Sequence, residues 1–243
     1  MQTFRSIVFT ALAAGLLVGL VTTLVHQVGV VPLILEAETY EAAEAVPAAA
    51  HSHSHDQGHG HDTAAASSPE HHHDAKAWTP QDGWERTLFT ALADVLTSTG
   101  FALLMSSAFV LVRRRLSWRE GLLWGLAGFT VFSLAPSLGL PPELPGMAAG
   151  DLMARQMWWI GTAMATALGL TLIASRRSGR TIALAAILLA APHIIGAPAA
   201  PAEESGVPMA LWSEFVIVAL ASSLVSWLAL GSITAAFHRR LFA

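Results

Sequence analysis

The stretch Ser6–Val25, SIVFTALAAGLLVGLVTTLV, determines the class of fold because it contains no charged side chain. An α-helix rises 1.5 Å per residue, so about 20 apolar residues cross the hydrocarbon core of a bilayer. A cleaved signal peptide with Arg5 as its charged region is the alternative. However, this apolar stretch is longer than usual for a signal peptide, and the small residues Ala48–Ala50 lie far downstream. We therefore predict a retained transmembrane helix.

Further apolar stretches recur along the 243 residues, which are 53% hydrophobic and only 12% charged. A soluble domain usually has about twice that charged fraction. We predict an all-α integral membrane protein, a bundle of about six transmembrane helices that forms one polytopic domain over residues 1–243. Five spans are the alternative, because Pro192 and Pro198 interrupt the fifth stretch. The predicted spans are Ser6–Val25, Thr87–Val112, Gly121–Leu140, Gln156–Ser175, Thr181–Ile195 and Met209–Phe237.

The basic residues predict the orientation of these spans. If the N-terminus is cytoplasmic, six spans place ten of the thirteen Lys and Arg residues inside, as the positive-inside rule expects. Both termini would then be cytoplasmic, and the loop over residues 40–80 would be extracytoplasmic. The ten inner residues are Arg5, Arg113, Arg114, Arg115, Arg119, Arg176, Arg177, Arg180, Arg239 and Arg240, and the three outer ones are Lys76, Arg86 and Arg155.

The outer loop contains eight of the eleven histidines. Neutral imidazole binds Zn, Ni, Co or Cu, so a flexible His-rich string is typical of loose, multivalent metal capture. Its Ala, Ser, Gly and His composition predicts disorder in the absence of a ligand. A polar linker without a metal role is the alternative reading. The candidate metal ligands in this loop are His51, His53, His55, His59, His61, His71, His72 and His73.

Acidic and imidazole groups also occur in or beside the predicted spans, mostly toward the outer face. An ionisable residue inside a membrane usually faces a bundle interior or a wet cavity, and Asp94 lies about two turns into its helix. The alternatives are a hydrogen bond from Thr97 or Ser98 to Asp94, and snorkelling of Glu214 to the interface. His26 is interpreted as an interfacial cap. The candidate metal ligands of this group are Glu36, Glu38, Asp94, Glu143, His193 and Glu214.

Three motifs indicate local structure. The four prolines within Ala135–Gly146 predict a broken segment, either a pore entrance or an interfacial turn. Gly15-X-X-X-Gly19 and Gly121-X-X-X-Gly125 predict close helix packing. The pair Trp158–Trp159 is typical of an interfacial aromatic belt.

Several function classes find no support in the sequence. There is no cysteine, no P-loop and no metalloprotease or serine-hydrolase motif, so we expect no enzymatic activity. No basic patch is interleaved with aromatic residues, so no nucleic-acid partner is expected. The expected partners are a divalent metal ion and the lipid bilayer.

Several outer segments together resemble the CbtA family, the predicted cobalt-transporter membrane subunit of bacteria. The resemblance implies cobalt uptake in the bacterial cytoplasmic (inner) membrane and a small one-helix, histidine-bearing CbtB-type subunit as partner. It implies no tightly bound cofactor, only transported or loosely bound Co²⁺, with Ni²⁺ and Zn²⁺ as alternatives. The segments are Val31–Glu38 (VPLILEAE), Glu85–Thr90 (ERTLFT), Gly121–Phe129 (GLLWGLAGF), Leu140–Gly146 (LPPELPG), Ala154–Trp159 (ARQMWW) and Pro192–Pro198 (PHIIGAP).

The function predicted from these features is that of a divalent-metal, most simply cobalt, uptake permease subunit. Its outer His-rich loop would capture the metal for a pathway between the helices. The alternative is a non-transporting metal-binding receptor or accessory subunit. Metal selectivity and energy coupling are left open by the sequence.

Overall fold

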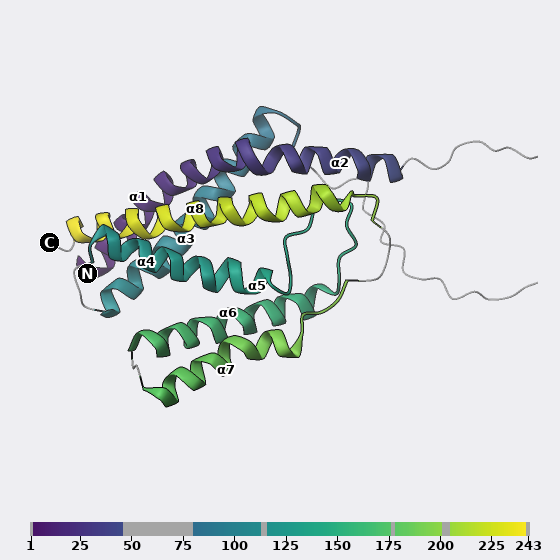
Figure 1. Ribbon diagram of the computed structural model, residues 1–243. Helices are drawn as coiled ribbons and strands as arrows, with labels where there is room; N and C mark the ends of the chain where they lie inside the picture. Colours follow the sequence, from purple (N-terminus) through teal and green to yellow (C-terminus); the bar gives the residue numbers. More distant parts are fainter. Residues whose placement is uncertain (1, 46–79, 113–115, 176–177, 201–204, 242–243) are drawn as a thin grey trace, which may run out of the picture.

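The computed structural model describes residues 2–45, 80–112, 116–175, 178–200 and 205–241, and every regular element in these ranges is helical. The rods that these elements form run alternately in opposite directions along the bundle (Figure 1). They are α1 (Gln2–Val25), η1 (His26–Val30), α2 (Val31–Ala45), α3 (Trp84–Val112), α4 (Trp118–Phe129), η2 (Thr130–Leu134), α5 (Ala135–Ser137), α6 (Leu152–Ser175), α7 (Gly179–Ile195) and α8 (Met209–Leu241).

The first helix is longer than the sequence predicted. Val31 has helical dihedral angles (φ −59°, ψ −43°), so α1, η1 and α2 form one continuous rod through Ala45. The prediction of a disordered loop from residue 40 is therefore wrong for residues 40–45. These residues are mostly Ala and Glu, which have high helix propensity and continue a helix that has already begun.

Two π-helical segments each precede a proline. Pro32 follows η1 by two residues, and Pro136 follows η2 by two residues. Proline lacks an N–H group and clashes with the carbonyl one turn earlier, and a wider π-turn accommodates both problems without ending the helix. Both π-helices contribute a side chain to the same cavity, as described below.

The core of the protein consists of α1, α3, α4 and α8 (Figure 1). A methyl group on Gly19 would lie 2.4 Å from the Val95 Cα, and one on Gly125 would lie 2.3 Å from the Trp227 carbonyl oxygen. These distances show that α1 contacts α3, and α4 contacts α8, almost backbone to backbone. The prediction of two glycine seams is confirmed.

Helices α6 and α7 form a hairpin beside this core (Figure 1). They pack mainly on each other, and α6 also contacts η2 and α5. The Trp158 Nε1 donates a hydrogen bond to the Pro192 carbonyl oxygen at 3.2 Å. This bond links the first turns of α6 to the last turn of α7.

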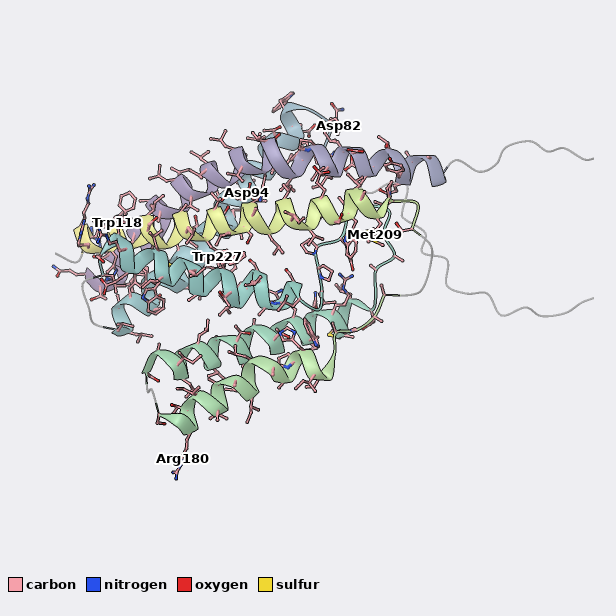
Figure 2. All side chains as sticks on the ribbon, in the orientation of Figure 1. Asp82, Asp94, Trp118, Arg180, Met209 and Trp227 are labelled. Atoms are coloured by element: carbon pink, nitrogen blue, oxygen red, sulfur yellow. The ribbon has the colours of Figure 1, made fainter. Side chains whose placement is uncertain are left out.

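The bundle has two chemically different ends. One, called the basic end, contains both termini, the start of α4 and the α6–α7 turn, where Trp118 and Arg180 are labelled (Figure 2). The other, called the loop end, contains α2, the start of α3 and the connections on either side of the α6–α7 hairpin, and Asp82 and Met209 are labelled there. The described arginines of the basic end are Arg5, Arg119, Arg180, Arg239 and Arg240, and those of the loop end are Arg86 and Arg155.

Within the described residues, four helices are long and apolar enough to cross a membrane. The remaining helical segments are the α4–η2–α5 rod and the 17-residue apolar helix α7. The protein therefore has the fold of a multi-pass helical membrane protein. The four candidate spans are Gln2–Ala43, Trp84–Val112, Leu152–Ser175 and Met209–Leu241.

Candidate functional site

Asp94 lies inside the bundle, about midway along its length (Figure 2). Its Oδ2 atom is 3.0 Å from the Thr23 Oγ1 and 3.2 Å from the His26 Nδ1. Only 14% of the Asp94 side chain and 29% of the His26 side chain are exposed. The structure therefore joins the Asp94 carboxylate of α3 to the His26 imidazole at the first position of η1. In the described contacts, neither Thr97 nor Ser98 is a hydrogen-bond partner of Asp94.

A cavity of about 250 Å³ opens beside this pair. Helices α1, α3 and α8 form most of its wall, and η2 and α6 close it with Ser133 and Trp159. Hydroxyl groups predominate among its polar side chains. The hydroxyl-bearing residues of the wall are Thr22, Thr97, Ser98, Ser133, Ser223 and Ser226.

These hydroxyls form short hydrogen bonds between helices. Thr22 Oγ1 donates to the Ser226 Oγ at 2.9 Å, and the Ser133 and Ser223 Oγ atoms are 2.7 Å apart. The Trp227 Nε1 donates to the Ser133 Oγ at 3.2 Å. Each hydroxyl can also accept, so the wall offers several oxygen lone pairs next to the carboxylate.

A second, larger cavity of about 700 Å³ continues toward the loop end. Both cavities share the side chains of Phe132, Ser133, Trp159 and Ser223 as walls. The second cavity also reaches the proline-rich segment, whose Pro141 and Pro142 line it. The two cavities therefore adjoin each other across these four side chains.

Trp159 is the residue of α6 that lines both cavities. Its ring lies 6.1 Å from that of Phe132, so the two aromatic side chains meet at the junction. Trp159 therefore faces the junction of the two cavities, and its membership of an interfacial belt stays a prediction. Trp158, its neighbour, instead lies edge-on to His193 at 6.0 Å.

Glu143 lines the second cavity, as does Arg155. The Arg155 Nη2 donates to the Glu143 Oε2 at 2.7 Å, and both side chains are about three-quarters buried. The ion pair neutralises the negative charge of the Glu143 carboxylate in the second cavity. A cation arriving from the loop end would have to share or displace Arg155.

The remaining acidic candidates of the loop end lie away from these cavities. Glu38 is ion-paired with Arg86, which also bonds the Asp82 Oδ1 at 3.1 Å. Glu36 is exposed on α2. Neither Glu36 nor Glu38 lines either cavity.

His193 and Glu214 are also not brought to Asp94. His193 is half-buried against Trp158 near the end of α7, and Glu214 is exposed on α8. Neither residue lines the two cavities. Of the six acidic and imidazole candidates of the helical part, Asp94 lines the first cavity and Glu143 lines the adjoining one, and the other four line neither.

The eight loop histidines lie outside the described residues; they are His51, His53, His55, His59, His61, His71, His72 and His73. In the part of the chain that the structure describes, no group of three or more His, Cys, Asp and Glu side chains is positioned to hold a metal ion. The metal-binding chemistry found there is the pair of one carboxylate and one imidazole, supplemented by hydroxyl oxygens.

His26 is the functional candidate that the sequence analysis missed, because it was interpreted as an interfacial cap. The available signal was its position six residues before Pro32. A proline within a long helix predicts a local disturbance upstream, and such π-turns frequently occur at functional sites. The hydroxyl-bearing wall residues of α8 carried no comparable signal.

The fold is that of a multi-pass helical membrane protein, and its site is a part-buried carboxylate–imidazole pair beside a cavity with several hydroxyl groups in its wall. The chain also matches, over residues 4–239, the family described as "Probable cobalt transporter subunit (CbtA)". Because this match covers nearly the whole chain, the protein belongs to the CbtA family, and the resemblance seen in the sequence is confirmed. Neither a curated protein nor a solved structure matches the chain significantly.

Proposed function

We propose that this protein is the conducting membrane subunit of a cobalt uptake system, and that Co²⁺ passes through a site between Asp94 and His26. One observation supports this most strongly: the pair lines a cavity with several hydroxyl groups in its wall, and this cavity adjoins a second one that extends toward the loop end. A carboxylate inside a membrane bundle is costly unless it has a function or a partner. Here it has one imidazole neighbour and faces an accessible space.

The ligand chemistry of the pair suits a borderline transition-metal ion. Imidazole nitrogen binds Co²⁺, Ni²⁺ and Zn²⁺ well, and carboxylate oxygen supplies negative charge. The hydroxyls of Thr22, Thr23 and Ser226 offer further oxygen ligands in place of lost hydration water. With one full negative charge, the site can bind a dication without holding it too tightly to release it.

The proposed route runs from the loop end to the basic end. The histidines of residues 51–73 would capture the ion outside the cell. The ion would then pass Glu143 and reach Asp94, and it would leave at the cytoplasmic basic end. Six crossings with both termini inside, in a bacterial inner membrane, fit the grouping of arginines at that end. A dication moving inward gains about 4.6 kcal/mol per 100 mV of membrane potential, so the potential is a sufficient driving force.

The word "subunit" in the family description implies further subunits of the transporter. We propose a small CbtB-type membrane protein as the partner. Liposomes that contain this chain alone, compared with liposomes that contain both proteins, would show whether flux needs the partner. Metal binding without flux in both preparations would favour the receptor or accessory role instead.

The direct test replaces Asp94→Asn and measures radioactive cobalt uptake in cells that express the full chain with its genomic partners. Loss of one charged ligand is expected to cost about 1.5–3 kcal/mol, which is roughly a 10- to 100-fold loss of uptake at low Co²⁺. Glu214→Gln is the control, because it removes an acid of the candidate span α8 that lines neither cavity. Full uptake by the folded Asp94→Asn protein would disprove the proposed site.

A further inference from the structure

Three hydroxyl groups in the half of the core toward the basic end have no hydrogen-bond partner within the described residues. They are the Thr10 Oγ1, the Ser106 Oγ and the Thr234 Oγ1. All three side chains are completely buried. In contrast, Thr162 and Thr171 of α6 donate to the carbonyl oxygen four residues earlier, as helical hydroxyls usually do. The three core hydroxyls lack this bond.

The three hydroxyls come from three helices that contact one another, α1, α3 and α8 (Figure 1). The helix register places them in one layer about 9 Å deep. Gly15 faces Thr99, so Ser106 lies opposite residue 8 of α1. Thr22 is bonded to Ser226, so Thr234 lies opposite residue 14 of α1. With 1.5 Å per residue, the three residues fall within roughly 9 Å along the bundle axis.

His238 belongs to the same layer, because the register of α1 and α8 places it opposite Thr10. Its side chain is also buried, and its ring lies edge-on to Phe109 at 5.6 Å. The layer therefore contains one imidazole and three hydroxyl oxygens. Because they are spread over about 9 Å, these donors can contact a largely hydrated transition-metal dication in turn rather than all at once.

The layer lies beyond the inner wall of the Asp94 cavity. Val18 and Leu230 form this wall, and they are only 1% and 3% exposed. Thr10 lies twelve residues from Thr22 on the same helix, which is about 18 Å nearer the basic end. A short apolar barrier thus separates two polar layers on one axis.

We infer that Thr10, Ser106, Thr234 and His238 form a second, inner station for the transported dication, with Val18 and Leu230 as the barrier between the two stations. This inference rests on the proposed function. The inner station has no carboxylate among its four donors, so it binds the ion more weakly than the Asp94 pair. A weak last site favours release, as conduction requires.

The absence of cysteine from the sequence allows a direct test with single-cysteine variants of the full chain in its native membrane. We choose Thr10→Cys and Ser106→Cys, with Leu12→Cys and Leu104→Cys as controls at similar depth. The control positions face outward, with 53% and 61% of the residue exposed. The probe is a small cationic methanethiosulfonate, which modifies thiols that water can reach.

Modification is expected at Thr10→Cys and Ser106→Cys and only background labelling at the two controls. Co²⁺ at about ten times its dissociation constant should slow the modification about tenfold, because roughly one-tenth of the sites stay free. Failure of the reagent to modify both inner variants would overturn the inference. Modification that Co²⁺ does not slow would also overturn it, since the layer would then hold only water.

A second measurement distinguishes this inference from the proposed function. Thr10→Val keeps the shape of the side chain and removes the hydroxyl, so we expect at least a severalfold loss of cobalt uptake with no loss of thermal stability. If Asp94→Asn transports normally, the proposed function fails. If Asp94→Asn is inactive but Thr10→Val transports at the full rate, only the inner station fails.

Discussion

A methyl group on Gly19 in the core would overlap the backbone of Val95, whereas one on Gly161 of the α6–α7 hairpin would meet nothing within 4 Å. The core helices are packed backbone to backbone, and the hairpin contacts the core mainly through η2 and α5. The carboxylate, imidazole and most hydroxyls of the site belong to the core. The hairpin contributes Trp159, which closes both cavities. The core therefore fixes the geometry of the ligands, and we expect the hairpin to open and close access to them.

The largest expected difference between the two regions is in stability. Gly125→Ala places a methyl group 2.3 Å from the Trp227 carbonyl oxygen and should force α4 away from α8. Overpacking of this kind costs about 1–3 kcal/mol. Gly161→Ala is the matched change in the hairpin and should alter stability by no more than about 0.5 kcal/mol. Thermal unfolding of both purified variants in the same detergent measures the difference, and equal melting temperatures would contradict the distinction between core and hairpin.

The second difference concerns the two histidines. His26→Ala removes the imidazole that contacts Asp94 in the core, and we expect cobalt uptake at low Co²⁺ to fall about tenfold, for a loss of about 1.4 kcal/mol of binding. His193→Ala removes an imidazole of the hairpin that packs on Trp158, and uptake should stay near the wild-type level. Uptake assays on cells with equal amounts of both variants test this. A stronger effect of His193→Ala would move the site to the hairpin.

The smallest expected effect is at the ion pair where the α5–α6 connection meets α6. Arg155→Gln removes a positive charge from the access cavity and leaves Glu143 unpaired. A partly exposed pair is worth about 0.2–1 kcal/mol, so the Co²⁺ concentration that gives half-maximal uptake should fall up to about fivefold. Concentration-dependent uptake measures this shift. A rise in the half-maximal concentration would show that Arg155 assists entry rather than opposing it.

The helices and their seams could be predicted from the sequence because bilayer thickness and glycine contacts are strong constraints. The interior position of Asp94 followed from the cost of a charge in lipid. The partner of Asp94 did not follow, because the π-turn before Pro32 determines where His26 points. Local spacing alone does not encode that contact.

The position of His193 and Glu214 away from the two cavities was also unpredictable, for a physical reason. Helices α7 and α8 are apolar around most of their circumference, so the sequence does not show which face points inward. The sequence likewise does not show which hydroxyls of α8 are buried. Serine and threonine occur on every face of a membrane helix, where they can bond their own backbone, and only packing identifies those that face a cavity.

The most direct test of the account is an anomalous scattering measurement at the cobalt absorption edge, on crystals of the full chain soaked in Co²⁺. The account predicts a peak between the Asp94 Oδ2 and the His26 Nδ1, on the wall of the 250 Å³ cavity. The peak should disappear in Asp94→Asn crystals grown under the same conditions. Cobalt peaks elsewhere on the protein, with none at this pair in the unaltered chain, would contradict the central claim.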